Sequence, residues 1–145
     1  MICVDASLAA KWVLPEEYSE EALALYIASV NSGEPIVAPA LLPYELTNIL
    51  RLRTLRTGLS SIDAQTLLTR FLAFPVLLQD SPSLHVRALS LSTLFNLPAT
   101  YDAHYLALAE QVACAFWTDD RRLLRQLNGK APYVHWIGDY REGGS

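Results

Sequence analysis

The chain carries little charge for its size and no basic excess. Of its 145 residues, 18% are charged and 52% are hydrophobic, which is typical of a compact globular domain and excludes a disordered or fibrous one. The net charge is −4, so the basic patch that usually marks a nucleic-acid-binding protein is not evident. Acidity argues only weakly against a nucleic-acid substrate, because a metal bound among acidic residues reverses the local charge.

Long hydrophobic runs, a leader pattern and paired cysteines are also missing. The apolar runs are far shorter than the roughly 18 residues of a membrane span. Residues 1–5 have no basic region and reach a carboxylate at once, so we expect no secretory signal and a cytoplasmic protein. The two cysteines, Cys3 and Cys114, lack the spacing of a zinc site. Burial as small apolar side chains is favoured for both, and a disulfide stays open.

Short apolar segments alternate with helical patterns along the whole chain. Strands are predicted at residues 2–4, 36–38, 76–78, 114–118 and 133–137. Helical segments are predicted at residues 8–14, 16–31, 43–57, 60–71, 81–96, 101–112 and 120–127. This alternation predicts an α/β fold with a central parallel sheet of about five short strands and helices on both faces. We expect a single domain over residues 1–140 and a loose tail over residues 141–145.

Proline, glycine and small polar residues set the expected helix boundaries. Pro15 occupies a position typical of a helix start, which predicts that the helix 16–31 begins directly after it. Gly58 is expected to end the helix 43–57. Ser60 and Thr100 are predicted to cap the helices that follow them, and Ser81 precedes Pro82 at another helix start.

Four carboxylates stand where predicted strands end or predicted helices begin. They are Asp5, Glu45, Asp102 and Asp120, and each follows or lies within a mainly apolar phrase. A buried carboxylate is costly unless a positive group meets it, and only Asp120 has a basic neighbour in sequence, Arg121. In open parallel sheets the active crevice lies beyond the carboxyl ends of the strands. We therefore expect the four acids to converge at that edge.

Each acid also has a purely structural explanation. Asp5 could form an Asx turn, and Glu45 could be the acid of a capping box. Asp102 could complement a helix dipole, and Asp120 could cap the helix that it opens. Taken singly, these explanations are favoured. Taken together they weaken, because four independent caps need not share one edge of a sheet.

Several carboxylates that converge without imidazole or thiolate partners suit a hard cation, Mg²⁺ or Mn²⁺. The matching chemistry is hydrolysis of a phosphodiester bond. A bound metal lowers the pKa of a water molecule and offsets the charge of the phosphate. The sequence does not say whether one or two ions bind.

The phrases around these acids resemble the PIN domain and, more narrowly, the VapC-like toxins of type II toxin–antitoxin pairs. The phrases are Val4-Asp5-Ala6-Ser7, Tyr44-Glu45-Leu46-Thr47-Asn48, Tyr101-Asp102-Ala103-His104-Tyr105 and Trp117-Thr118-Asp119-Asp120. They follow the family's order and spacing over nearly the whole chain. The resemblance implies a PIN-like fold and a Mg²⁺- or Mn²⁺-dependent ribonuclease. It also implies a protein that is often a homodimer and is held inactive by a cognate antitoxin.

The resemblance also assigns individual residues. It implies that the metal-site and catalytic acids are Asp5, Glu45, Asp102 and Asp120, with Asp5 and Asp102 as direct ligands. The family's polar positions, which orient the acids or the attacking water, match Ser7, Asn48 and Thr118. One departure concerns the position between Thr118 and Asp120. It is usually a small residue in the family, and here it is Asp119, which could share or take the role of Asp120.

Other function classes fit less well. A phosphotransfer receiver domain needs an acidic pair after the first strand, and a haloacid-dehalogenase-like phosphatase needs an aspartate where Ser7 stands. The serious alternative is a PIN-like fold kept as a protein- or RNA-binding module without catalysis. In that case the two predicted helices of residues 47–74 would serve as a partner clip. The full set of four acids favours the nuclease.

Basic and imidazole side chains give weaker signals. Arginines gather at the end of the helix 43–57 and after Asp120. They either form a solvated face or contact the phosphates of a nucleic acid, and the two interpretations are near even. At Arg53 the solvated face is favoured. The arginines of the two groups are Arg51, Arg53, Arg56, Arg121, Arg122 and Arg125. A packing or surface role is favoured for His104, and no role is assigned to His85 or His135.

Overall fold

The structure is a computed structural model that describes residues 1–143. Its centre is a sheet of five short strands: β1 (Ile2–Val4), β2 (Ile36–Pro39), β3 (Val76–Gln79), β4 (Ala115–Thr118) and β5 (Val134–Trp136). Their order across the sheet is β3-β2-β1-β4-β5, and every neighbouring pair is parallel. The predicted central parallel sheet of about five strands is confirmed. The middle strands β1 and β2 are fully buried.

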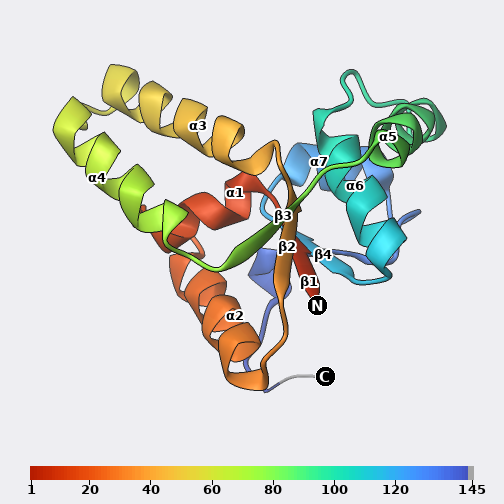
Figure 1. Ribbon diagram of the computed structural model, residues 1–145, viewed down its shortest axis with the longest axis horizontal. Helices are drawn as coiled ribbons and strands as arrows, with labels where there is room; N and C mark the ends of the chain where they lie inside the picture. Colours follow the sequence, from red (N-terminus) through yellow and green to blue (C-terminus); the bar gives the residue numbers. More distant parts are fainter. Residues whose placement is uncertain (144–145) are drawn as a thin grey trace.

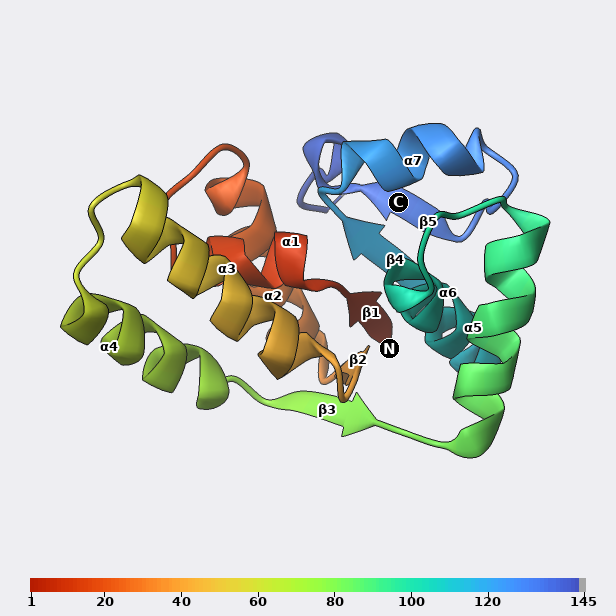
Figure 2. The same cartoon turned by 90° about the horizontal axis from the view of Figure 1, so that it is seen from above.

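Helices cover both faces of this sheet, as the alternation predicted. They are α1 (Ala6–Ala9), η1 (Ala10–Trp12), α2 (Ser19–Ser32), α3 (Leu42–Arg56), α4 (Ser61–Leu72), α5 (Pro82–Leu94), α6 (Tyr101–Val112), α7 (Arg121–Leu127) and η2 (Ile137–Asp139). Figure 1 and Figure 2 show α1 to α4 on one side and α5 to α7 on the other. The chain fills the sheet outward from β1 in both directions, so right-handed crossovers place the two sets of helices on opposite faces.

Strand order reverses at β1, and this reversal positions the functional region. The chain leaves β1 toward β2 and β3, then returns to β4 on the other flank of β1. Segments that follow β1 and β4 therefore emerge side by side at the carboxyl edge, where crevices of such sheets form. Asp5 directly follows β1, and residues 119–120 directly follow β4.

An aromatic cluster holds α2 and the end of α4 against the first helical turns. Trp12 is 6% exposed and lies 5.4 Å from Tyr26 and 5.3 Å from Phe74, measured between ring centroids. Phe71 stacks on Trp12 at 6.3 Å. The indole Nε1 of Trp12 donates a hydrogen bond to the carbonyl oxygen of Ala22 at 3.0 Å, so its polar atom is satisfied in the core.

The predicted start of the helix 16–31 is wrong. Helix α2 begins at Ser19, after Tyr18 in the left-handed region with φ 66°. The residues before it form a turn around the buried ammonium of Lys11, which donates to the carboxylate of Glu16 and to the carbonyl oxygen of Glu17. This tertiary contact overrides the local signal of Pro15.

One of the two predicted caps, Ser60, is confirmed, and Ser81 adds a cap at the helix start that was predicted at Ser81-Pro82. The hydroxyl oxygens of Ser60 and Ser81 accept hydrogen bonds from the third residue after each, and so cap α4 and α5. Thr100 has helical backbone angles and makes no side-chain cap, so the predicted capping by Thr100 is wrong. Its carbonyl oxygen instead accepts hydrogen bonds from the backbone N–H and the Nδ1 of His104.

The described residues also bear on membrane spans, on the two cysteines and on the C-terminal tail. No helix within residues 1–143 is long and apolar enough to cross a membrane. Cys3 and Cys114 are both free thiols. The expected loose tail includes residues 144–145, which lie outside the described residues, and within the rest of it Arg141 donates hydrogen bonds to the carbonyl oxygens of Gly138 and Tyr140.

Candidate active site

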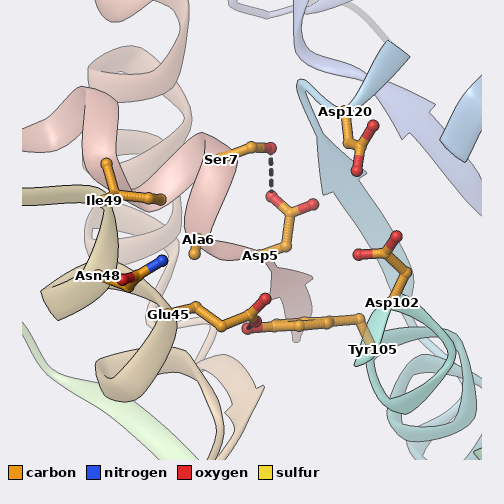
Figure 3. Close-up of a pocket in the computed structure, with 9 residues that line it drawn as sticks. All are labelled: Asp5, Ala6, Ser7, Glu45, Asn48, Ile49, Asp102, Tyr105 and Asp120. Atoms are coloured by element: carbon orange, nitrogen blue, oxygen red, sulfur yellow. Dashed lines mark hydrogen bonds between the residues drawn. The ribbon is translucent and has the colours of Figure 1, made fainter. Parts of the chain in front are cut away.

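All four predicted acids line one cavity of about 230 Å³ at the carboxyl edge of the sheet. Figure 3 shows the nine residues that line it: Asp5, Ala6, Ser7, Glu45, Asn48, Ile49, Asp102, Tyr105 and Asp120. Asp5 and Ser7 come from the start of α1, Glu45 and Asn48 from α3, Asp102 and Tyr105 from α6, and Asp120 from the turn before α7. Four segments far apart in sequence thus present carboxylates to one space.

Asp5 is held in place by its own helix. It is only 5% exposed, and its Oδ1 accepts a hydrogen bond from the backbone N–H of Leu8 at 3.1 Å, which makes it the N-cap of α1. The hydroxyl of Ser7 donates to the same oxygen at 2.7 Å. The structural explanation expected for Asp5 was an Asx turn after the strand, and the structure instead makes it a helix cap that fixes a carboxylate at the cavity wall.

Thr118 links Asp5 to the segment that carries Asp120. Its buried hydroxyl donates to the Oδ2 of Asp5 and accepts a hydrogen bond from the backbone N–H of Asp120 at 2.9 Å. Ser7 makes a parallel link, because its hydroxyl oxygen accepts from the backbone N–H of Asp119 at 3.0 Å. The two predicted supporting hydroxyls therefore tie the end of β4 to the end of β1.

Replacing Thr118 by Val is expected to lower the free energy of unfolding by about 2–3 kcal/mol. The change keeps the shape but leaves the Asp120 N–H and one oxygen of Asp5 without a partner in a buried site. Thr118→Ser is the matched control, since it keeps the hydroxyl and loses one methyl group, worth about 1 kcal/mol. Urea unfolding checks both, and a Val variant as stable as the Ser variant would contradict the linking role.

Glu45 is positioned from the opposite side of the cavity. The phenol of Tyr105 donates a hydrogen bond to its Oε1 at 2.5 Å. Tyr105 is fully buried and stacks on Phe116 of β4 with ring centroids 5.8 Å apart, so its hydroxyl is rigidly placed. Sequence reasoning missed this residue. Its signal is its place one helical turn after Asp102, which puts both on the same face of α6.

Asp102 and Asp120 complete the acidic wall. The Oδ1 of Asp120 accepts from the backbone N–H of Leu123 at 3.0 Å and caps α7. The carboxylate of Asp102 makes no hydrogen bond to any residue within 1–143, although it is partly buried. Both oxygens of this carboxylate are thus available to a ligand in the cavity.

Burial and neighbouring negative charges raise the pKa values of three acids in the cavity. Burial raises the pKa of Asp5 to about 7, although hydrogen bonds from Thr118, Ser7 and Leu8 act in the opposite direction. Burial, and then the nearby charges of Asp120 and Glu45, raise the pKa of Asp102 to about 6. Burial also raises the pKa of Glu45, and the bond from Tyr105 counteracts it. Such clustered shifts are typical of functional sites and would be relieved by a cation.

Asp119 points elsewhere. Its Oδ2 lies 2.9 Å from the Nζ of Lys11, and its Oδ1 accepts a hydrogen bond from the indole of Trp136 at 2.9 Å. Lys11 is only 4% exposed and also contacts Glu16, so Asp119 belongs to a buried charge network behind the cavity. Asp119 is not among the residues that line the cavity. Sequence reasoning missed Lys11 as its partner, because the two are far apart in the chain.

Some of the predicted arginines form ion pairs, and others are exposed without one. Arg53 is partly buried and pairs with Glu16, so it lies in an ion pair and not on the solvated face favoured for it. Arg121 pairs with Glu17 and lies over the rings of Tyr18 and Trp136 at 5.5 and 5.0 Å. The exposed members of the predicted set that form no ion pair within residues 1–143 are Arg51, Arg56, Arg122 and Arg125.

The donor set of the cavity suits a hard divalent cation. No group of three or more His, Cys, Asp or Glu side chains within the described part of the chain forms a ready-made cage. Mg²⁺ does not require one, because it keeps several waters and takes one or two carboxylates from a protein. The lining offers carboxylate oxygens and the amide of Asn48, with no thiolate or imidazole among the nine residues. The unpartnered carboxylate of Asp102 is the most available ligand.

Comparison with models of protein families gives a match. The model of the family described as the PIN domain matches residues 2–129. The matched range includes all four acids that line the cavity. Comparison with curated proteins finds no match.

Proposed function

Because the chain belongs to the PIN domain family, we propose that it is a Mg²⁺- or Mn²⁺-dependent endoribonuclease. PIN domains are in general metal-dependent nucleases, so a nuclease-type function follows from membership. The observation that carries the proposal is the cavity in which Asp5, Glu45, Asp102 and Asp120 meet at the point where strand order reverses. A purely structural role for all four does not explain why they share one cavity.

Different residues of the cavity would bind the cation and accept the proton. Asp5 and Asp102 would hold the ion, with Glu45 and Asp120 placed to hold its waters. The bound cation would offset the charge of the scissile phosphate and acidify a water molecule. Tyr105 occupies only one oxygen of Glu45, and the raised pKa of this carboxyl suits the acceptance of a proton from the attacking water. The amide of Asn48, which lines the same cavity, can orient that water.

RNA is compatible with the acidic net charge of the protein. Four exposed arginines, Arg51, Arg56, Arg122 and Arg125, lie on α3 and α7, the two helices that contribute Glu45 and follow Asp120. They are free of ion pairs within residues 1–143 and can meet backbone phosphates on either side of the cut. The negative cavity itself would be neutralised by its cation.

We further propose that the protein is the toxin of a VapBC-type pair, acts in the cytoplasm, forms a homodimer and is inhibited by a cognate antitoxin. The order and spacing of the four acidic phrases support this subtype. The α3–α4 hairpin extends away from the sheet, as Figure 1 shows, and exposes Leu55, Ile62 and Leu72 by 62%, 76% and 58%. Large exposed apolar side chains on a projecting hairpin favour a protein partner there. The alternative is a silent PIN-like binding module that uses the same hairpin.

The test is cleavage of total cellular RNA by purified, partner-free protein in Mg²⁺ or Mn²⁺, with the cut ends mapped by sequencing. Discrete cuts that disappear with a chelator and in the Asp5→Ala and Asp102→Ala variants would support the nuclease. Cuts that persist in both variants would come from a contaminant and refute the site. Folded protein that makes no cuts would favour the silent module.

Substitutions at the adjacent aspartates are expected to separate catalysis from stability. Asp120→Asn keeps a good helix cap but removes an acid from the cavity, so cleavage should fall by about a hundredfold or more with little change in stability. Asp119→Asn leaves the buried Lys11 with one acidic partner fewer, so the free energy of unfolding should fall by about 2 kcal/mol while cleavage by folded protein stays within a few fold. Cleavage rates and urea unfolding check the pair, and the reverse pattern would assign the site to Asp119.

A further inference from the structure

A second cavity, of about 360 Å³, opens beside the acidic one. The ends of β2 and β3 and the starts of α3, α5 and α6 surround it, and its walls include Pro39, Leu41 and Leu84. Its volume lies in the range of about 300–1,000 Å³ that is typical of small-ligand pockets. The proposed reaction makes no use of it.

Two tyrosines tie this cavity to the acids. Tyr44 directly precedes Glu45 on α3, and Tyr101 directly precedes Asp102 on α6. Both cavities are lined by residues of α3 and α6, so a ligand held against the tyrosines lies on the same two helices that carry Glu45 and Asp102. His104 also lines the second cavity, from the same helix as Asp102. The two cavities are therefore neighbours that share two helices.

Both tyrosines are exposed without an aromatic partner. Tyr44 is 77% exposed and Tyr101 is 60% exposed, whereas Tyr105 on the same helix as Tyr101 is fully buried. Within residues 1–143 neither ring stacks on another aromatic ring, although most aromatic rings of the chain do so. Packing of the fold does not account for two open rings at the mouth of one cavity. Aromatic faces of this kind are platforms for stacking.

A chain of hydrogen bonds makes one wall of the cavity rigid. The Nδ1 of His104 donates to the carbonyl oxygen of Thr100 at 2.6 Å, because a carbonyl can only accept. The Nε2 of His104 lies 3.0 Å from the Nδ1 of His85, and the Nε2 of His85 lies 2.8 Å from the Oδ1 of Asp80. His85, to which the sequence assigned no role, thus lies between His104 and Asp80. All four ring nitrogens are engaged, so this wall offers ring faces and not metal ligands.

Gln79 supplies an uncommitted polar group. It ends β3 at the edge of the cavity and is exposed. Its side-chain amide makes no hydrogen bond to any residue in the described part of the chain. An amide offers one acceptor and two donor positions in a plane, which matches the hydrogen-bonding edge of a nucleobase. The cavity therefore combines apolar walls, open aromatic faces and a single planar polar group.

We infer that this cavity binds one unpaired nucleobase of the RNA next to the scissile bond, stacked on Tyr44 and Tyr101 with its polar edge toward Gln79. The inference rests on the proposed ribonuclease function and adds a base preference to it. Sequence-specific recognition of RNA relies on unpaired bases stacked on aromatic side chains. The acid that lines this cavity, Asp80, has its Oδ1 2.8 Å from the Nε2 of His85. A flexible single strand can place a base here and its phosphate among the acids.

The test compares cut-site sequences and cleavage efficiency of the full-length, partner-free protein with those of Tyr44→Ala and Tyr101→Ala. Each loss of a stacking ring is expected to lower kcat/KM by about ten- to a hundredfold and to flatten the base preference beside the cut. Tyr44→Phe and Tyr101→Phe keep the ring and are expected to keep that preference. Ile27→Ala is a matched control, because it removes an exposed apolar side chain on α2, away from both cavities.

Binding separates this inference from the nuclease proposal. Short single-stranded RNAs of each base are titrated into the Asp102→Asn protein, with and without the tyrosine substitutions, and followed by fluorescence anisotropy. A tenfold or larger loss of affinity for one base is the expected result. Active wild-type protein whose preference and affinity are unchanged by the Ala variants would overturn the inference and leave the nuclease standing. If the Ala variants keep the base preference but no longer elute as a dimer in size-exclusion chromatography, the inference is overturned and the cavity is a contact with a second copy of the chain. Wild-type protein that neither cuts nor binds RNA would overturn both.

Discussion

Replacing Asp102 by Asn is expected to reduce RNA cleavage by about a thousandfold or more without weakening the fold. Asp102 lines the acidic cavity and makes no hydrogen bond to residues 1–143, so the amide breaks no internal contact. The variant loses a ligand for the divalent cation, whose charge stabilisation is worth several kcal/mol in the transition state, and each 1.36 kcal/mol is about tenfold in rate. Single-turnover cleavage at saturating Mg²⁺ measures the effect.

Glu110→Gln is the matched control for this substitution. It makes the same acid-to-amide change on the same helix, but Glu110 pairs with Arg87 on α5 and does not line the cavity. Cleavage should stay within a few fold of wild type, with a small loss of stability of the kind expected for an exposed ion pair. An equal loss of cleavage in both variants would show that the effect comes from the state of α6 and not from the cavity.

In the absence of divalent cations, the protein is expected to become more stable as the pH falls from 8 to 5. The pKa of Asp5 is raised from 3.8 to about 7 in the folded protein, so the folded state binds a proton at pH values where the unfolded chain has lost it. Stability therefore rises as the pH falls through 7 and levels off below about 4, where both states are protonated. The difference corresponds to about 4 kcal/mol for Asp5, and Asp102 adds to it in the same direction.

Urea unfolding in a chelator at pH 5, 6, 7 and 8 measures this dependence. Asp5→Asn removes one buried titrating group, since an amide does not ionise, and should make the profile shallower and leave the smaller part that Asp102 contributes. Added Mg²⁺ should stabilise the wild type more at pH 8 than at pH 5, because it favours the ionised acids. A profile that rises toward pH 8 without metal would mean that the acids are not held in a desolvated cluster.

Much of the fold was predictable because its signals are local. Each of the five strands is a short apolar segment, and Ser60, Ser81 and Gly58 mark helix ends through contacts within a few residues. The convergence of the acids was predictable from topology alone, since the carboxyl ends of parallel strands meet at one edge. An acid can cap a helix and also line the shared cavity, because Asp5 and Asp120 each have both roles.

What could not be predicted depends on contacts between distant segments. Lys11 reshapes the start of α2 and engages Asp119, a residue more than a hundred positions later. The resemblance favoured Asp120 over Asp119 by its Thr-x-Asp spacing but left a shared role for Asp119 open, and the contact with Lys11 shows that Asp119 does not line the cavity. The phenol of Tyr105 reaches Glu45 across sixty positions. Local spacing carries no information about such pairs.

The most direct test of the account is a titration of Mn²⁺ into the purified protein, followed by electron paramagnetic resonance of the free ion. We expect saturable binding to the wild type that Mg²⁺ displaces, binding that is lost or at least tenfold weaker in Asp102→Asn, and unchanged binding in Glu110→Gln. Equal affinity in wild type and Asp102→Asn would contradict the account, because the acidic cavity would then not be the cation site on which RNA cleavage depends.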